Sequence, residues 1–465
     1  MRALFTACVA MTIAVMPTGA QAPGPMSPEQ LRARLAAFAG DSLLGRKAGT
    51  PAHAKATQYI VNQLDALRGA GLSPMGDSAK WTQSVPLVTV QLDSTRTRLT
   101  GIKEQSSPIA YSVDFAPMLG ILGFPSALPD SLRVTAIVSG GQLGSPTAVK
   151  PDAVRGKIVL FLPPRRPSGQ PDYQLWSYTD LLATYKKSAA VIVESLDLTP
   201  RSLMARIKGP WLELPNQPNP EVPLPPVIAV SHAAAFLLAD EHLPNRKVPG
   251  RASFAFSMRR EATEVPAHNI LAMLPGSDAT LSQEVVVLSA HSDHLGVADA
   301  LQRTSDDSIF NGADASGTGS VALLAIAEAL AASPLKPQRS IVFLWTVGGE
   351  RGELGSRWFS QHPTFKLDRI VAHIDVDMIG NGQTVATSVA CPRSARRLGG
   401  SQSAEVFFTS VSNATGGGLY DEPQRIDYER YAGATQALAA LVMEMASGAR
   451  RPKVKGVDTE AGCAR

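Results

Sequence analysis

Four short segments of the sequence carry side chains that could bind a metal ion and activate water. They contain His291 with Asp293, Asp314, Glu350, and Asp377. Imidazole and carboxylate groups are ligands of catalytic zinc, which commonly has three protein ligands and one open position. Because His291 and Asp293 are two residues apart, the carboxylate can hold one ring nitrogen and direct the other toward a metal. A single triplet of this kind is common, so the chemistry depends on whether the four segments meet.

Each of these segments adjoins an element that the hydrophobic pattern predicts. We expect strands over Val285–Ser289, Ser340–Thr346 and Ile370–Asp377, and a helix over Ser320–Ala332 after the Gly-rich turn that contains Asp314. The first two strands are apolar on both faces, which is typical of central strands covered by helices. Ligands of open α/β sheets gather at the carboxyl ends of the strands. The pattern therefore predicts a zinc-type site at one sheet edge.

The rest of the chain divides into an N-terminal helical layer and a β-rich stretch. Two helices are expected within Pro28–Leu67, with a cap at Ser27–Gln30 and a break at Gly45–Pro51. From about Asp114 to Met258, short apolar strands alternate with Pro-rich loops. These strands are Val134–Val138, Ile158–Leu162, Val191–Val193 and Val227–Val230. The loop from Pro210 to Pro226 carries seven prolines, so we expect it to be extended and without regular structure.

Composition describes a globular protein of two or three domains. The chain has 465 residues, of which 44% are hydrophobic and 18% charged, and its net charge is +4. These values exclude collagen, a coiled coil and a disordered tail. The sequence has no run of Lys and Arg interleaved with aromatic residues, so no nucleic-acid partner is expected. The sequence makes no prediction of the oligomeric state.

The first 22 residues have the layout of a secretory signal peptide. Arg2 precedes an apolar run from Ala3 to Met16, and small residues follow it, with Ala20 as the favoured cleavage point. The alternative, a membrane anchor, needs about 20 apolar residues, and this run is shorter. We therefore expect a secreted or periplasmic protein that is not inserted in the membrane. Cys391 and Cys463 then remain, and their pairing is left open because sequence separation does not give their distance in space.

Nine ordered segments resemble those of the secreted bacterial zinc aminopeptidases that carry a protease-associated insert, relatives of glutamate carboxypeptidase and of the transferrin receptor ectodomain. The resemblance covers most of the mature chain. The segments are Asp41–Arg46, Val154–Leu160, His268–Asp278, Ser289–Gly296, Asn311–Asp314, Phe343–Thr346, Leu354–Arg357, Asp377–Gly380 and Asp421–Tyr428.

The resemblance implies a fold and a domain order. The fold class is α/β, with a mixed central sheet sandwiched by helices as in zinc exopeptidases, and with an inserted β-rich protease-associated domain. The implied order is a signal peptide over residues 1–22, a helical part of the peptidase domain over 23–105, the insert over 106–262, the catalytic domain over 263–450 and a tail over 451–465.

The resemblance also implies a dinuclear zinc centre, but only part of it carries over. His291 matches the first ligand, Glu350 the ligand glutamate, Asp377 the ligand aspartate, and Asp293 the residue that orients a ligand from the second shell. Three positions differ: the bridging aspartate falls on Ala315, the proton-accepting glutamate on Gly349 and the last ligand histidine on Gly417.

These departures leave a site with fewer metal ligands than the family has. No histidine follows His373, so a shift in alignment cannot restore the last ligand, whereas Asp314 could replace the bridging aspartate. His291, Asp314 and Asp377 could hold one zinc ion, with Glu350 as a spare ligand or a weak second site. Loss of a general base costs about a hundred- to ten-thousand-fold in rate, and the sequence does not indicate which group would replace it.

Two functions from different classes follow from the resemblance and its departures. The first is an exported zinc-dependent exopeptidase that removes N-terminal residues from peptides. The second is a catalytically inactive relative that keeps the fold and acts as a peptide-binding or interaction module. A third reading, hydrolysis of a non-peptide amide, shares the metal chemistry and differs only in substrate. The family resemblance supports the first reading, while Ala315, Gly349 and Gly417 favour the second.

Overall fold

The structure is a computed structural model of the chain, and it describes most of the residues. The described ranges are 24–100, 109–117, 131–142, 148–163, 184–198, 209–215, 225–239, 250–257, 259–298, 307–388, 404–411 and 418–452. The proposed signal peptide, Cys391, Cys463 and Gly417 lie outside these ranges.

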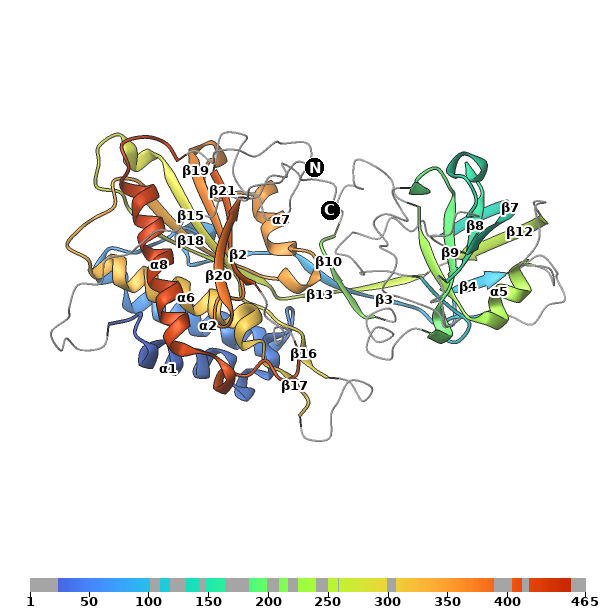
Figure 1. Cartoon of the computed structure of the whole chain (residues 1–465), viewed down its shortest axis with the longest axis horizontal. Helices are drawn as coiled ribbons and strands as arrows, with labels where there is room; N and C mark the ends of the chain where they lie inside the picture. Colours follow the sequence, from blue (N-terminus) through green and yellow to red (C-terminus); the bar gives the residue numbers. More distant parts are fainter. Residues whose placement is uncertain are drawn as a thin grey trace, which may run out of the picture.

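A mixed eight-stranded sheet forms the centre of the larger lobe (Figure 1). Its order is β1-β14-β18-β15-β19-β21-β20, and β2 also pairs with β14. Strands β18, β15, β19 and β21 run parallel to one another. Strand β14 pairs antiparallel with β18, β20 pairs antiparallel with β21, and β1 and β2 each pair antiparallel with β14. The bounds are β1 (Ser73–Pro74), β2 (Thr82–Ser84), β14 (His268–Leu274), β15 (Val285–His291), β18 (Ser340–Thr346), β19 (Ile370–Val376), β20 (Gln383–Ser388) and β21 (Ala404–Val411).

Helices cover both faces of this sheet. One face packs against α1 (Pro28–Ala39), α2 (Pro51–Ala66), α6 (Thr318–Ala332) and α8 (Tyr428–Ser447), and the other against α7 (Leu354–Gln361). In β15, Val286 and Leu288 face the first layer, and Val285 and Val287 face the second. Burial on both sides explains why these strands read as continuous apolar runs.

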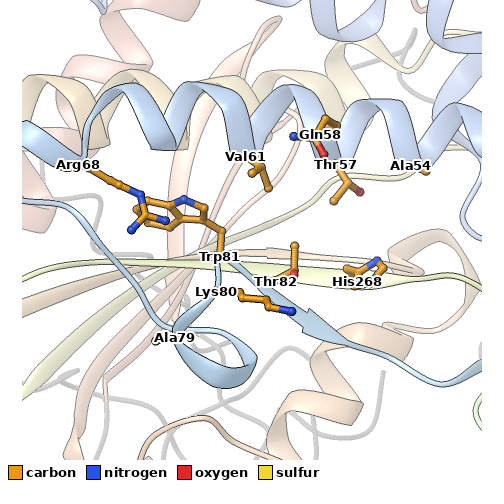
Figure 2. A pocket seen from close by; sticks show the side chains of 10 residues that line it. All are labelled: Ala54, Thr57, Gln58, Val61, Arg68, Ala79, Lys80, Trp81, Thr82 and His268. Carbon is orange, nitrogen blue, oxygen red and sulfur yellow. The ribbon is translucent and has the colours of Figure 1, made fainter.

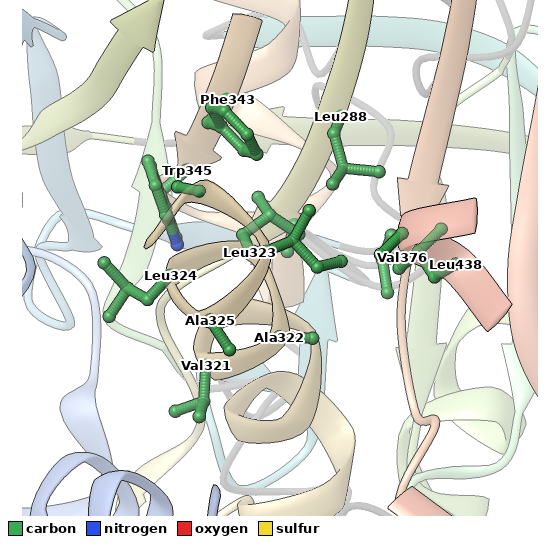
Figure 3. Packing of buried hydrophobic residues seen from close by; sticks show 14 of the residues in the cluster. Leu288, Val321, Ala322, Leu323, Leu324, Ala325, Phe343, Trp345, Val376 and Leu438 are labelled. Carbon is green, nitrogen blue, oxygen red and sulfur yellow. The ribbon is translucent and has the colours of Figure 1, made fainter. Parts of the chain in front are cut away.

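Helix α6 is buried along most of its length. Its side chains pack against Phe343, Trp345 and Leu288 of the sheet and against Leu438 of α8 (Figure 3). By length and composition, Ala313–Ala332 could cross a membrane, and it is the single such helix in the described ranges. The structure buries 83% of its most apolar window inside the protein, so it is a core helix.

A second eight-stranded sheet forms the smaller lobe, which is joined to the larger one by a three-stranded sheet (Figure 1). The joining strands are β3 (Leu87–Leu92), β10 (Trp211–Glu213) and β13 (Arg260–Val265). The second sheet has the order β5-β4-β12-β7-β8-β9-β11-β6 and a separate hydrophobic core on each face. Its bounds are β4 (Arg98–Thr100), β5 (Ile109–Ala110), β6 (Phe115–Pro117), β7 (Ser131–Gln142), β8 (Ile158–Leu162), β9 (Ala190–Glu194), β11 (Val227–Val230) and β12 (Gly250–Ser257), with α5 at His232–Ala239.

The predicted α/β class and central elements are confirmed, with small changes at their ends. Ser27 caps α1 by accepting a hydrogen bond from the backbone of Gln30, as its position predicted. Strand β15 continues to His291, two residues beyond the expected end, and α6 begins at Thr318. The prediction that the Pro-rich loop lacks regular structure is wrong. Within it, Trp211–Glu213 forms β10, because these residues pair with Val88–Val90 of β3.

Candidate metal centre

The carboxyl ends of three neighbouring parallel strands bring the predicted site residues to one edge of the central sheet. Strand β15 lies between β18 and β19, and His291 is paired in register with Thr346 of β18. In the pairing of β15 with β19, Ser289 is opposite Asp375. Two residues further along both strands, His291 and Asp377 therefore lie side by side. Glu350 follows β18 in a short helical turn, Gly349–Arg351. This is the strand-end arrangement that the sequence predicted.

His291 lies between two carboxylates. Its Nε2 is 3.6 Å from Oδ1 of Asp377, and its Nδ1 is 3.6 Å from Oδ1 of Asp293. The backbone N–H of Gly349 donates to the same Asp293 oxygen at 2.9 Å and holds that carboxylate in place. Burial alone would lower the pKa of His291, but the two carboxylates outweigh it and raise the pKa well above 6.5. A metal ion would have to displace that proton, since metals bind the neutral imidazole.

Glu350 is committed to a different histidine. Nδ1 of His294 lies 2.9 Å from Oε1 of Glu350, and the His294 side chain is fully buried while that of Glu350 remains 25% exposed. Burial would raise the pKa of Glu350, but the hydrogen bond and charge of His294 lower it below 4.5. Nε2 of His294 has no hydrogen-bond partner in the described part of the chain. The carboxylate therefore stays ionised and faces the edge of the site.

Asp314 lies in a π-helical turn, Ala313–Gly317, that leads into α6. Its Oδ1 accepts hydrogen bonds from the backbone of Gly380 at 2.7 Å and from the hydroxyl of Thr318 at 3.2 Å. The side chain is fully buried. These bonds tie the turn to the segment that follows Asp377, so the Asp314 oxygen stabilises the protein's own backbone.

Asp421 holds the same turn from the opposite side. Its Oδ1 accepts from the backbone N–H of Asp314 at 2.7 Å, and its Oδ2 accepts from that of Ala315 at 3.0 Å. The first N–H groups of a helix lack partners within the helix, and a carboxylate there is stabilising. Asp421 therefore caps the turn that positions Asp314.

Arg46 connects the N-terminal layer to the loops of the site. Its buried guanidinium donates to the carbonyls of Phe38, Ser292, Asn311 and Gly312 and to the hydroxyl of Ser316 at 2.8–3.3 Å. Burial lowers the pKa of Arg46 to about 10, while Asp421, Asp293 and Glu350 act in the opposite direction. The group remains a cation at neutral pH, and its five bonds fix the loops on which the site residues lie.

A buried pair, His53 and Ser292, supports the loop after β15. Nε2 of His53 is 3.0 Å from Oγ of Ser292, and that hydroxyl donates to the carbonyl of Thr346 at 3.1 Å. Because the Ser292 proton points to Thr346, His53 donates to Ser292 and does not activate it as a nucleophile. The pair therefore joins α2 to the ends of β15 and β18.

Gly349, at the position expected for the proton-accepting glutamate, has no room for a side chain. A Cβ built there would lie 2.5 Å from Cβ and Cγ of His291 and 2.7 Å from its Nδ1. Contacts below 3.0 Å force a shift of the neighbour. The glycine allows the turn to pass directly beside the His291 ring.

The residues at this edge fit one metal ion better than two. Ligands of a tetrahedral zinc ion at 2.0–2.1 Å lie about 3.3 Å apart, close to the 3.6 Å between His291 and Asp377. Glu350 lies near them with a partly exposed carboxylate. Asp314 is hydrogen bonded elsewhere. No group of three or more His, Cys, Asp and Glu side chains is gathered as a complete ligand set within the described ranges.

The structure thus brings His291, Asp293 and Asp377 together, pairs Glu350 with His294 within electrostatic range of His291, and turns Asp314 toward the backbone. Sequence reasoning missed four residues that support the site: Arg46, His53, His294 and Asp421. Arg46 and Asp421 lie in segments that carry the family resemblance, and His294 completes a His-Ser-Asp-His run. His53 had no local signal, because its partner is 239 positions away in the chain.

Comparison with known proteins agrees with this architecture. Residues 269–433 match the sequence model of peptidase family M28. An aminopeptidase from Aneurinibacillus sp. strain AM-1 has a similar fold, with a TM-score of 0.51 and 14% identity over 93% of this chain and 96% of that one.

Two further solved structures are similar at lower scores. A zinc aminopeptidase from Bacillus subtilis has a TM-score of 0.48 and 18% identity over 91% of this chain and 96% of its own. A peptidase M28 precursor from Shewanella amazonensis SB2B has a TM-score of 0.43 and 16% identity over 92% and 97%. No curated protein sequence matches the chain. By family resemblance the chain is a hydrolase of the peptidase type, and residues 269–433 form a peptidase family M28 domain.

Proposed function

We propose that this protein is an exported exopeptidase of the aminopeptidase type that uses one zinc ion. The observation that carries the proposal is the approach of His291 Nε2 and Asp377 Oδ1 to 3.6 Å at the strand ends of a peptidase family M28 domain. His291 and Asp377 would be ligands, and Glu350 a third. A peptide with a free N-terminus would be the substrate. Export is inferred from the layout of the first 22 residues.

Zinc in such a site lowers the pKa of bound water and polarises a carbonyl group. The protein's own residues would orient the reactants. Asp293, fixed by the Gly349 N–H, sets the ring of His291. Glu350 is kept ionised by His294, is partly exposed and lies within electrostatic range of His291, so it can accept a proton. One carboxylate cannot at once bind the metal and take the proton, so we expect slow turnover.

A second function is favoured by Gly349. A glycine packed against His291 leaves the expected base position without any group that could accept a proton. A chain of this kind could keep the fold and bind peptides without cleaving them. This alternative differs from the first in having no metal-dependent turnover.

Metal content and cleavage of an amino-acid arylamide panel test the two functions together. The purified mature protein is analysed for zinc, and cleavage is measured with and without added zinc and a chelator. About one equivalent of zinc with chelator-sensitive cleavage supports the exopeptidase. Non-peptide amides in the same panel test the amidase reading.

Substitutions at the proposed ligands complete the test. His291→Ala and Asp377→Ala should each remove the metal, whereas Asp375→Asn on the same strand should retain it. Peptide binding without zinc or turnover would instead support the second function. Mass spectrometry of the protein released by expressing cells tests export, which predicts a chain shortened by about 20 residues.

A further inference from the structure

A cavity outside the metal centre lies between α2 and the strands β2 and β14 (Figure 2). Its volume is about 490 Å³, within the range of sites that hold small molecules. Figure 2 shows α2 on one side, Lys80 and Thr82 on the other, Trp81 with Arg68 at one end and His268 at the other. The wall combines apolar groups, such as Val61 and the indole of Trp81, with polar groups that face them.

Positive charge predominates on the wall, because none of the ten lining residues is acidic. Arg68 lies over the Trp81 ring at 4.8 Å, and Asp65 behind them accepts from Nε of Arg68 at 2.8 Å and from Nε1 of Trp81 at 2.7 Å. Asp65 therefore balances Arg68 and fixes the indole. Lys80 forms no ion pair with any residue in the described part of the chain, so its ammonium group is available to a ligand.

The backbone before Lys80 is held in an unusual conformation. Ser78 and Ala79, neither of them glycine, both have left-handed φ angles of 51° and 57°. The backbone N–H of Gly76 donates to the carbonyl of Lys80 at 2.7 Å, and the N–H of Lys80 donates to that of Asp77 at 3.0 Å. Such conformations are costly and cluster at binding sites. Here the turn carries Lys80 to the wall that faces α2.

Other polar groups on the wall are also unused. The ring of His268 makes no hydrogen bond within the described residues, and burial lowers its pKa below 6.5, so it is neutral at pH 7 and has one donor and one acceptor. Gln58 donates its amide N–H to Asn62 at 2.7 Å, which leaves its carbonyl oxygen for another partner. The cavity therefore offers a cation, neutral polar groups and apolar wall atoms.

We propose that this cavity binds a small organic carboxylate that carries an apolar group. The carboxylate pairs with Lys80, and the apolar group lies on Trp81 and Val61. N-acylated amino acids and short acidic peptides belong to this class. The site is independent of the proposed peptidase function, since none of its lining residues belongs to the candidate metal centre.

Ligand-observed NMR titration of the full mature chain tests the proposal. The probe is N-acetyl-leucinate, and its neutral control is N-acetyl-leucinamide, which has the same shape without the charge. The acetyl group removes the free amine that an aminopeptidase substrate needs. For a ligand of about a dozen atoms we expect a dissociation constant on the order of 1 mM, and about tenfold weaker binding of the amide.

Three lysine variants decide where the probe binds. Lys80→Gln should weaken N-acetyl-leucinate at least about fivefold, and Lys80→Glu should abolish binding. Lys55→Gln, at an exposed position on α2 that does not line the cavity, should leave it unchanged. The proposal is overturned if no binding occurs at ten times the expected constant, or if Lys80→Gln binds like the wild type. Binding that His291→Ala abolishes and Lys80→Gln does not would place the probe at the metal centre and also overturn it.

Discussion

The backbone of Gly349 passes directly beside the ring of His291. A Cβ at position 349 would lie 2.5 Å from Cβ of His291, and the N–H of Gly349 donates to the Asp293 oxygen that lies 3.6 Å from Nδ1 of the same histidine. The glycine is thus part of the geometry that fixes His291. Restoring a glutamate at 349 is therefore more than the addition of a missing base.

Gly349→Ala and Gly349→Glu should both destabilise the protein. Either side chain forces His291 or the turn to move, and overpacking of this kind costs about 1–3 kcal/mol. We expect Gly349→Glu to leave arylamide cleavage no faster than in the wild type, although it supplies a carboxylate. Urea unfolding and steady-state kinetics measure the two effects.

Gly433→Ala is the matched control for these variants. Gly433 lies on the exposed side of α8, and a Cβ there would meet nothing within 4 Å. Alanine is favoured over glycine inside a helix, so this variant should gain about 0.5–1 kcal/mol. If Gly349→Glu were as stable as the wild type and cleaved arylamides more than tenfold faster, the close packing of Gly349 on His291 would be wrong.

Arg46→Met should be among the most damaging single substitutions. It leaves four carbonyls and the Ser316 hydroxyl without their donor in a site closed to water, and we expect a loss of at least about 3 kcal/mol in the free energy of unfolding. Arg430→Met is the control, because that side chain is 64% exposed and pairs with Asp427 on the surface. Its effect should stay below about 1 kcal/mol. Similar losses in the two variants, measured by urea unfolding, would contradict the bridging role of Arg46.

The local pattern was sufficient to predict the elements that carry the site. Strands such as Ser340–Thr346 are buried on both faces, and a run of apolar residues has no other stable arrangement in a sheet covered by helices. The meeting of His291 with Asp377 followed from parallel strands that end at the same edge. The strands themselves depend on residues that are near one another in the sequence, and the general rule for parallel strands then places their ends together.

Features that depend on distant residues could not be predicted in the same way. The orientation of Asp314 is set by Gly380 and Asp421, which lie 66 and 107 positions away. Whether Glu350 faces a metal or His294 depends on a pairing across 56 positions. Strand β10 forms in a Pro-rich segment because β3 is available as a partner, although local propensity disfavours it.

His53 should make stability depend on pH in a defined window. Burial is the main reason that the pKa of His53 falls from 6.5 to about 4 in the folded protein. The unfolded chain therefore binds more protons between these values, so this contribution to stability is complete above about pH 6.5 and is lost as the pH falls through 4. The difference corresponds to about 3 kcal/mol.

His53→Gln isolates this contribution, because the amide keeps a donor for Ser292 but does not titrate. Unfolding free energies of both proteins are measured by urea titration at pH 7, 5.5 and 4.5. The wild type should lose more stability than the variant over this range, since all other groups titrate in both. Parallel curves for the two proteins would show that folding does not lower the pKa of His53.

Asp421→Asn tests whether the bidentate cap holds the turn that contains Asp314. The amide replaces one oxygen by an NH₂ group that faces a backbone N–H, which leaves a buried donor unsatisfied at a cost of about 1–3 kcal/mol. Hydrogen exchange at the amides of Asp314 and Ala315 should speed up in the variant. Asp427→Asn is the matched control: Asp427 caps α8 on the surface, and asparagine is as good an N-cap as aspartate, so stability should change by less than about 1 kcal/mol. Unchanged exchange at both amides in Asp421→Asn would show that the turn is held by α6 itself, without the carboxylate.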